Sequence, residues 1–196
     1  MTDPAGSVTL LTGRNGVGKT RALLAECRGV PGAVFLDPFS SAAAAGQLAI
    51  LRSGLSAERA KRLADLMRIA GLRGDGRAEG GARWLFAVGT AILGARQGAT
   101  VAIDNIEAGL HHSVLPGLWS VLLDAAAERA LRVFASTHSS DCWAALTRVA
   151  SERTASCHPE VKLVLMLRGG KRFTFSLEEM STALDGEIDL RGGHVD

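Results

Sequence analysis

The sequence predicts an α/β fold of three layers around a mainly parallel sheet. Short apolar runs such as "SVTLLT" and "ATVAID" alternate with longer segments of helical spacing, which is typical of parallel sheets covered by helices. Two last apolar runs, separated by a short glycine-containing stretch, predict a C-terminal β-hairpin. With 196 residues, of which 47% are hydrophobic, the chain suits one domain, 1–196, with a substantial core.

The strands are predicted from short apolar or β-branched runs that end at turn or polar residues. The first run, "SVTLLT", stops at Gly13, and "AVFLD" stops before Pro38. The run "ATVAID" has no polar face until its last residue, as a parallel strand covered on both sides requires. The predicted strands span residues 7–12, 33–37, 99–104 and 131–137, followed by "VKLVLML" and "RFTFSL", which a two-residue turn at Gly169 and Gly170 joins.

The helices are predicted from apolar residues at helical spacing, such as Leu63, Leu66 and Met67. Between residues 40 and 72 this pattern indicates two helices broken near Ser53 and Gly54, which form a helical sub-lobe at about 40–80. A glycine-rich, charged loop follows at 71–81. Further helices are predicted at 19–27, 84–93, 113–130, 141–151 and 177–184.

Composition limits the classes of partner. The formal net charge is only +2, with 22 basic and 20 acidic residues, so charge gives no support to binding of nucleic acid or of an anionic membrane. Cys27, Cys142 and Cys157 are scattered, which is typical of reduced thiols rather than of a zinc site or disulfides. The N-terminal segment lacks the pattern of a signal peptide and no apolar run reaches membrane-spanning length, so we expect a cytoplasmic protein.

The stretch after the first strand matches the full G-x-x-x-x-G-K-[ST] pattern of a phosphate-binding loop. Its glycines let successive backbone N–H groups face a phosphate chain at the start of a helix, where the helix dipole favours anions. Lys19 is expected to reach the β and γ phosphates, and the Thr20 hydroxyl to bind Mg²⁺. A chance glycine-rich turn is the alternative, which eight matching positions in strand-loop-helix context disfavour. The predicted nucleotide-binding residues are Gly13, Arg14, Asn15, Gly16, Val17, Gly18, Lys19 and Thr20.

A second polar element follows the apolar strand 99–104. Asp104 ends that strand, which is where the P-loop fold places the carboxylate that holds Mg²⁺. The alternative is an aspartate that only caps the next turn. Because ligands of such sheets bind at the carboxyl ends of the strands, Gly13, Asp104 and Thr137 are expected at one edge. Together with the phosphate-binding loop, Asp104 predicts a site for a nucleoside triphosphate with Mg²⁺, bound by Thr20 and Asp104.

Three segments resemble the ABC-like AAA family of ATPases, relatives of the overcoming-lysogenization-defect, recombination and chromosome-maintenance ATPases. They are "IDNIEAGLHHSVLPGLW", "VFASTHSSDCW" and "FSLEEMSTALDGEIDLR". The resemblance is weak between Cys27 and Arg77, a short and helical stretch with no room for a coiled-coil arm. It implies an ABC-ATPase-like head of short form, which binds Mg-ATP between two copies of the chain. It also implies an ATP-dependent homodimer that signals to a protein effector.

The resemblance assigns roles to three residues near the predicted site. It makes His138 the switch histidine, which contacts the γ-phosphate. Asn105 stands where the family has the glutamate that activates water, and an asparagine can hydrogen-bond a water without accepting its proton at neutral pH. Glu107 matches the second acid of the family pattern, and it is the alternative group for that catalytic role.

The stretch "RAEGGAR" at 77–83 occupies the place of the family's signature loop, which completes the partner's P-loop. Ala78 stands where a serine would contact the partner's phosphate. Gly80 and Gly81 still offer backbone N–H groups at the head of the following helix, an anion site that needs no side chain. A plain glycine-rich loop before a helix explains the stretch equally well, so both interpretations stay open.

Three functions follow from these residues. The first is a minimal ATPase that binds Mg-ATP, hydrolyses it slowly, dimerises on ATP and signals to a partner. The second is a hydrolysis-deficient, ATP-gated binding module, because Asn105 replaces the catalytic glutamate. The third is a small-molecule kinase, which "GLHHS" and "THS" after the strands disfavour. The sequence leaves the effector, the pathway and the base selectivity open.

Overall fold

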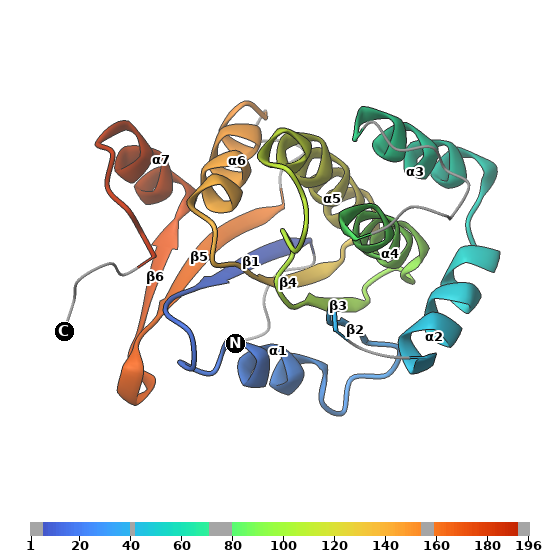
Figure 1. Ribbon diagram of the computed structural model, residues 1–196, viewed down its shortest axis with the longest axis horizontal. Helices are drawn as coiled ribbons and strands as arrows, with labels where there is room; N and C mark the ends of the chain where they lie inside the picture. Colours follow the sequence, from blue (N-terminus) through green and yellow to red (C-terminus); the bar gives the residue numbers. More distant parts are fainter. Residues whose placement is uncertain (1–5, 40–41, 71–79, 154–158, 192–196) are drawn as a thin grey trace.

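A six-stranded sheet forms the middle layer of the molecule (Figure 1). The structure is a computed structural model that describes residues 6–39, 42–70, 80–153 and 159–191. The strand order is β2-β3-β4-β1-β5-β6, in which β6 alone is antiparallel to its neighbour. The predicted α/β fold with a mainly parallel sheet is therefore confirmed. The strands are β1 Ser7–Thr12, β2 Val34–Leu36, β3 Thr100–Ile103, β4 Arg132–Ser136, β5 Glu160–Met166 and β6 Arg172–Ser176.

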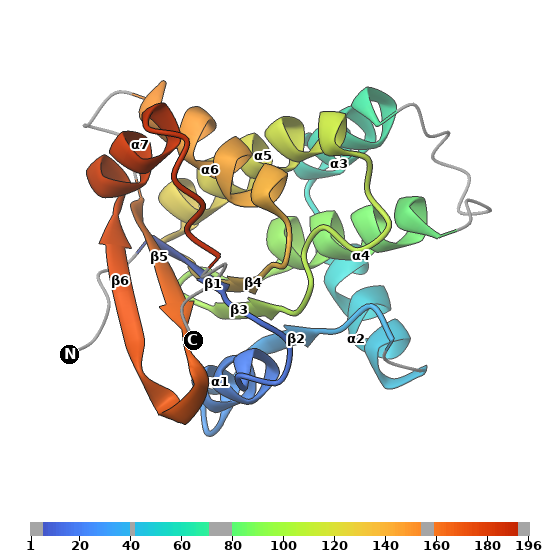
Figure 2. The ribbon, with the colours of Figure 1, turned by 60° about the vertical axis from the view of Figure 1, so that its left-hand side comes forward.

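Helices cover both faces of the sheet, as the apolar strands require. Every residue of β1 and of β3 is buried. On one face, Leu11 packs with Leu23 of α1 Lys19–Cys27. On the other face, Val8 and Leu10 belong to the larger apolar cluster, to which the four helices that cover this face contribute (Figure 2). These are α4 Gly81–Gly94, α5 Leu115–Arg129, α6 Ser140–Ser151 and α7 Leu177–Asp185.

Two further helices, α2 Ala42–Ser53 and α3 Ala57–Ile69, pack against α4. They match the two helices expected between 40 and 72, with the break directly after Ser53. Ser56 caps α3 by accepting a hydrogen bond from the Arg59 N–H. The part of the predicted sub-lobe and charged loop at 71–79 lies outside the described residues.

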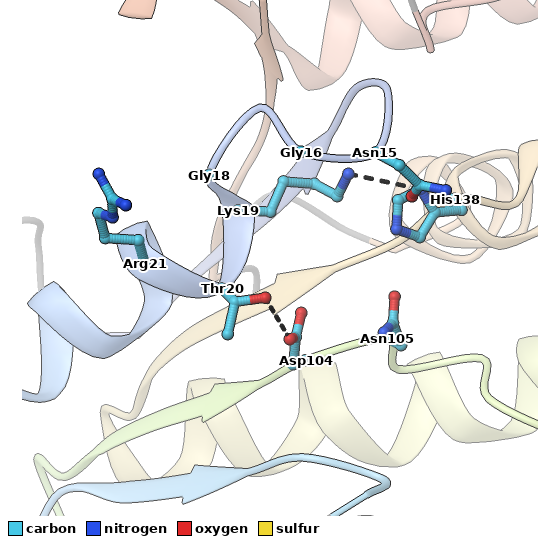
Figure 3. Close-up of a pocket in the computed structure, with 9 residues that line it drawn as sticks. All are labelled: Asn15, Gly16, Gly18, Lys19, Thr20, Arg21, Asp104, Asn105 and His138. Carbon is cyan, nitrogen blue, oxygen red and sulfur yellow. Dashed lines mark hydrogen bonds between the residues drawn. The ribbon is translucent and has the colours of Figure 1, made fainter.

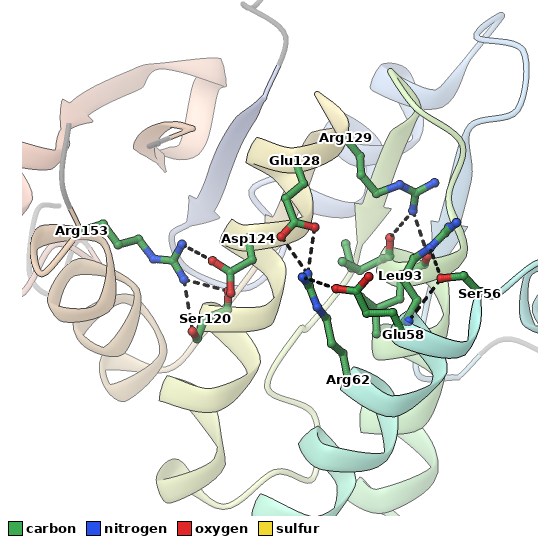
Figure 4. Close-up of polar contacts among 11 residues, drawn as sticks. Ser56, Glu58, Arg62, Leu93, Ser120, Asp124, Glu128, Arg129 and Arg153 are labelled. Atoms are coloured by element: carbon green, nitrogen blue, oxygen red, sulfur yellow. Dashed lines mark hydrogen bonds and ion pairs between the residues drawn. The ribbon is translucent and has the colours of Figure 1, made fainter. Parts of the chain in front are cut away.

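Arginine contacts join the C-terminal end of α4 to its neighbours (Figure 4). Arg59 of α3 and Arg129 of α5 both donate to the Leu93 carbonyl, at 3.2 and 2.8 Å. A helix end leaves its last carbonyls without partners in the helix, and cations near it are favourable. Arg62 of α3 also pairs with Glu128 of α5 at 2.8 Å. These contacts hold α4 in place, and α4 begins beside the loop that follows β3.

Two helices depart most from their predicted bounds. The helix expected at 84–93 begins at Gly81, and the one expected at 113–130 is divided into a 3-10 turn, His112–Val114, and α5. The two-residue hairpin turn is wrong. The Leu167 N–H donates to the Lys171 carbonyl at 2.9 Å, so the loop consists of Arg168, Gly169 and Gly170. The pairing of β5 with β6 fixes this loop length, and both glycines adopt positive φ within it.

Candidate functional site

Adjacent strand ends bring the predicted site residues to one edge of the sheet. The P-loop follows β1, Asp104 follows β3 and His138 lies two residues after β4. The Thr137 N–H donates to the Leu11 carbonyl at 2.9 Å, which holds the end of β4 against β1. A cleft of about 400 Å³ opens there (Figure 3). It is lined by Asn15, Gly16, Gly18, Lys19, Thr20, Arg21, Asp104, Asn105 and His138.

The backbone of the P-loop needs its glycines. Gly13 has a φ of 131°, and a Cβ there would lie 2.2 Å from the Met166 carbonyl oxygen, so no side chain fits between β1 and β5 at this point. Gly18 forms the N-cap of α1, also at positive φ, without a side-chain hydrogen bond to the helix. The first turn of α1 therefore has neither a capping side chain nor an acidic one. Such a helix start is suited to an anion.

Lys19 lies across the loop with its ammonium group turned inward. Its Nζ donates to the carbonyls of Gly13 and Arg14 at 2.7 and 3.0 Å. Burial lowers the pKa of Lys19, while the charges of Asp104 and Glu107 oppose that shift. The side chain is thus a desolvated cation held by loop carbonyls, which is the environment in which its attraction to a phosphate is strong.

Asp104 joins the P-loop helix to β4. Its Oδ2 accepts a hydrogen bond of 2.6 Å from the Thr20 hydroxyl, and its Oδ1 accepts one from the Ser136 hydroxyl. The carboxylate and the Thr20 hydroxyl are oxygen ligands of the kind that Mg²⁺ prefers, with few protein ligands and the remainder from phosphates. These two oxygen ligands fit a magnesium ion bound together with a nucleotide. Within the described ranges, no group of three or more His, Cys, Asp or Glu side chains is arranged to hold a metal.

The ring of His138 faces the ammonium group of Lys19. Its Nδ1 lies 3.4 Å from the Lys19 Nζ. Because an ammonium group can only donate, Nδ1 must be the acceptor and Nε2 carries the hydrogen. Burial and the nearby charge of Lys19 lower the pKa of His138, while Glu107 and Asp104 raise it. The ring is thus neutral at pH 7, with Nε2 as its N–H donor.

Asn105 lies in the cleft in an uncommon backbone conformation. Its φ is 48°, in the left-handed region that asparagine tolerates better than most residues. Its N–H donates to the Ser136 Oγ at 2.9 Å, while its Oδ1 is buried without a hydrogen-bond partner. This oxygen can accept a hydrogen bond from a water molecule, although an amide cannot take a proton at neutral pH.

Glu107 and the glycines of the expected signature loop do not line the cleft. Oε1 of Glu107 accepts a hydrogen bond of 2.8 Å from the His138 N–H. Gly80 and Gly81 begin α4, and Gly81 packs against the backbone of Gly109. Arg77, Ala78 and Glu79 of this expected loop lie outside the described residues, whereas Ala82 and Arg83 belong to α4.

In the P-loop and directly after it, the predicted nucleotide-binding residues and the residues that line the cleft differ at four positions. Gly13, Arg14 and Val17 belong to the P-loop but do not line the cleft. Arg21, which the predicted set omits, does line it, and its place directly after Thr20 was the available signal.

Two further contacts could not be found from the sequence pattern. Ser136 binds Asp104, and Arg191 donates to the His138 carbonyl at 3.4 Å across 53 positions of the chain.

Known proteins share this fold. The family described as "AAA domain, putative AbiEii toxin, Type IV TA system" matches residues 53–141. The structure of archaeal ribosomal stalk protein aP1 with archaeal ribosome recycling factor aABCE1 aligns with a TM-score of 0.62 and 12% identity, over 98% of this chain and 44% of that chain. This chain therefore spans less than half the length of that relative. No curated protein sequence matches the chain significantly.

Two transporter cassettes align over most of their own length. An ATP-binding subunit of an ABC transporter has a TM-score of 0.58 and 18% identity, over 97% of this chain and 85% of that chain. The dimeric structure of MJ0796, a bacterial ABC transporter cassette, has a TM-score of 0.55 and 18% identity, over 89% and 87%. At such identities these likenesses show the fold.

The fold and the family match confirm the resemblance drawn from the sequence, which is to the ABC-like AAA class of P-loop ATPases. In the part of the chain that the structure describes, no helix has the length and hydrophobicity to cross a membrane.

Proposed function

We propose that the chain binds Mg-ATP in the cleft, hydrolyses it slowly, dimerises on ATP and passes this state to a partner protein. The observation that carries the proposal is the convergence of Lys19, Thr20, Asp104 and His138 at adjacent strand ends. A cation and oxygen ligands for Mg²⁺ recur in sites for phosphoryl transfer from a nucleotide, and the imidazole N–H adds a preorganised donor for a phosphate oxygen.

Each side chain has a defined task in this proposal. Lys19 exchanges its loop carbonyls for phosphate oxygens, and the open start of α1 donates backbone N–H groups to the same phosphates. Thr20 and Asp104 hold Mg²⁺, which neutralises phosphate charge when it is bound. Nε2–H of His138 donates to the γ-phosphate. Asn105 orients the attacking water through Oδ1, which is the acceptor without a partner.

Homodimerisation is proposed from the resemblance and from the start of α4. Gly80 caps α4 without a side-chain hydrogen bond, and neither Gly80 nor Gly81 lines this chain's own cleft. Their N–H groups are therefore suited to the phosphates bound by a second copy. The effector is a further protein of unassigned chemistry.

The second candidate is an ATP-gated binding module that hardly hydrolyses ATP. Asn105 is the observation that favours it, because the amide cannot act as a base. In this case ATP occupancy itself is the signal. Size exclusion with and without Mg-ATP separates the candidates when phosphate release is measured in parallel. A dimer without phosphate release supports the module, whereas brisk turnover excludes it.

Replacing Asn105 by aspartate or glutamate is expected to raise steady-state phosphate release by about tenfold or more, because a general base is restored. Aspartate tolerates the left-handed backbone of position 105, whereas glutamate costs about 1–2 kcal/mol there. We therefore expect the aspartate variant to fold as well as the wild type and the glutamate variant to be less stable. The measurement is phosphate release with Mg-ATP, with Lys19→Ala as the zero reference. A wild type that is fast, and slowed by both substitutions, would contradict the role given to Asn105.

Nucleotide affinity is expected to depend little on the base. The chain has no tyrosine, and its tryptophans and phenylalanines all lie at described positions, none of which lines the cleft. Stacking of a base on an aromatic ring is worth about 1–3 kcal/mol, and this contribution is missing. Competition binding should therefore give dissociation constants for ATP, GTP and CTP within about tenfold of one another. A preference above about a hundredfold would show that the base is read by groups outside this cleft.

A further inference from the structure

Charged side chains from two distant segments bind the backbone N–H and the backbone carbonyl of His138. Oε1 of Glu107 accepts a hydrogen bond of 2.8 Å from the His138 N–H. Nη1 of Arg191 donates a hydrogen bond of 3.4 Å to the carbonyl of the same residue. These partners lie 31 and 53 positions away in the chain. A carboxylate on the N–H and a guanidinium on the carbonyl are each matched to the group they contact.

The loop that carries Glu107 is held so that the carboxylate faces the His138 N–H. The Ile106 N–H donates to the Ser136 carbonyl at 3.0 Å, and the Trp84 indole N–H donates to the Ile106 carbonyl at the same distance. The loop is thus fixed to both β4 and α4. Oε2 of Glu107 is buried without a hydrogen-bond partner, and Glu107 does not line the cleft. The Glu107 carboxylate therefore binds the His138 backbone and does not reach a reacting group in the cleft.

Arg191 is held in place by its own segment. Asp189 accepts hydrogen bonds from Nε and Nη2 of Arg191 and from its backbone N–H, at 2.9, 2.5 and 3.0 Å. Leu190, between the two, is only 6% exposed and belongs to the main apolar cluster. After α7 the chain therefore runs back and docks beside the segment that carries His138. The guanidinium reaches His138 from a segment that is anchored by its neighbours.

We propose that Glu107 and Arg191 are positioning residues that fix His138 against the γ-phosphate, so that the segment 188–191 helps to set how well the site distinguishes ATP from ADP. The inference rests on the proposed function. The backbone N–H and the backbone carbonyl of His138 are both held, which fixes the position of its Cα and hence of the ring that lines the cleft. A hydrogen bond weakens steeply when its donor is displaced or misaligned. Loss of either contact therefore weakens the interaction with the γ-phosphate and leaves the contacts with the α and β phosphates in place.

The test is the ratio of the ADP to the non-hydrolysable ATP-analogue dissociation constants, measured by calorimetry with Mg²⁺. His138→Ala gives the reference for a site without the γ-phosphate donor. We expect Glu107→Ala and Arg191→Ala to lower the ratio by about tenfold, the size of one charge-assisted hydrogen bond. Affinity for ADP should change less than twofold. Glu107→Gln keeps an acceptor and should retain most of the ratio, and Arg148→Ala, an exposed arginine of α6, is the matched control.

The outcomes separate the inference from the proposed function. If the wild type does not prefer the ATP analogue, the proposed function fails and the inference fails with it. If His138→Ala loses the preference while Glu107→Ala and Arg191→Ala keep it, the inference alone is overturned. The double variant Glu107→Ala with His138→Ala should lose no more than His138→Ala. A further additive loss would show that Glu107 acts independently of His138, which also overturns the inference.

Discussion

Lys19→Ala is expected to weaken ATP binding by about a hundredfold or more, because the variant loses a cation whose side chain is enclosed by the P-loop. The Lys19 side chain is only 6% exposed, and its Nζ contacts the Gly13 and Arg14 carbonyls and the His138 ring. A charged hydrogen bond contributes about 1.5–3 kcal/mol, and the ammonium group can donate several at once. Titration with a fluorescent ATP analogue measures the loss.

The control for Lys19→Ala is Lys61→Ala, which removes an exposed lysine from α3 and should bind ATP as the wild type does. Thermal unfolding checks the fold of both variants. Burial lowers the pKa of Lys19, which means that its charged form is disfavoured in the folded chain. Lys19→Ala should therefore have a melting temperature within a few degrees of that of the wild type. If Lys19→Ala bound ATP as tightly as the wild type, the cleft would not be the nucleotide site.

The strands and helices that the sequence predicted correctly are those whose burial follows from local pattern. The run "SVTLLT" became β1 Ser7–Thr12 without change, since all of its residues are buried between two helical layers. The hairpin turn was wrong because its length depends on register. The pairing of Met166 with Arg172 leaves room for a closing pair and a three-residue loop, and the Gly-Gly pair alone does not specify that register.

The sequence predicts those parts of the candidate site that lie within contiguous motifs. The spacing within Gly13 to Thr20 and the place of Asp104 after an apolar strand are local features, and the fold brings both to one edge. The positive φ of Asn105 is not predictable from the local pattern, in which the residue marks only the replacement of a glutamate. The Arg191 contact with His138 depends on how α7 and the following segment pack, and no local pattern encodes it.

Gly81→Ala is expected to lower the free energy of unfolding by about 1–3 kcal/mol, the cost of overpacking at a tight contact. A Cβ on Gly81 would lie 1.9 Å from the Gly109 carbonyl oxygen and 2.6 Å from its carbon, so the backbone itself must move. The start of α4 and the loop after β3 cannot yield independently, because the Trp84 indole N–H already binds the Ile106 carbonyl. The melting temperature should fall by about 3–10 °C for a chain of this size.

The same substitution is expected to disturb the site, since the displaced loop carries Asp104 and Asn105 at its start. Phosphate release should therefore fall by more than the loss of folded protein explains, with ADP affinity less affected, because the P-loop lies on β1 and α1. Gly46→Ala is the matched control. Gly46 is exposed in α2 with nothing within 4 Å of an added Cβ, so alanine there should stabilise the helix by about 1 kcal/mol. Equal melting temperatures for the two variants would show that Gly81 and Gly109 do not need their close approach.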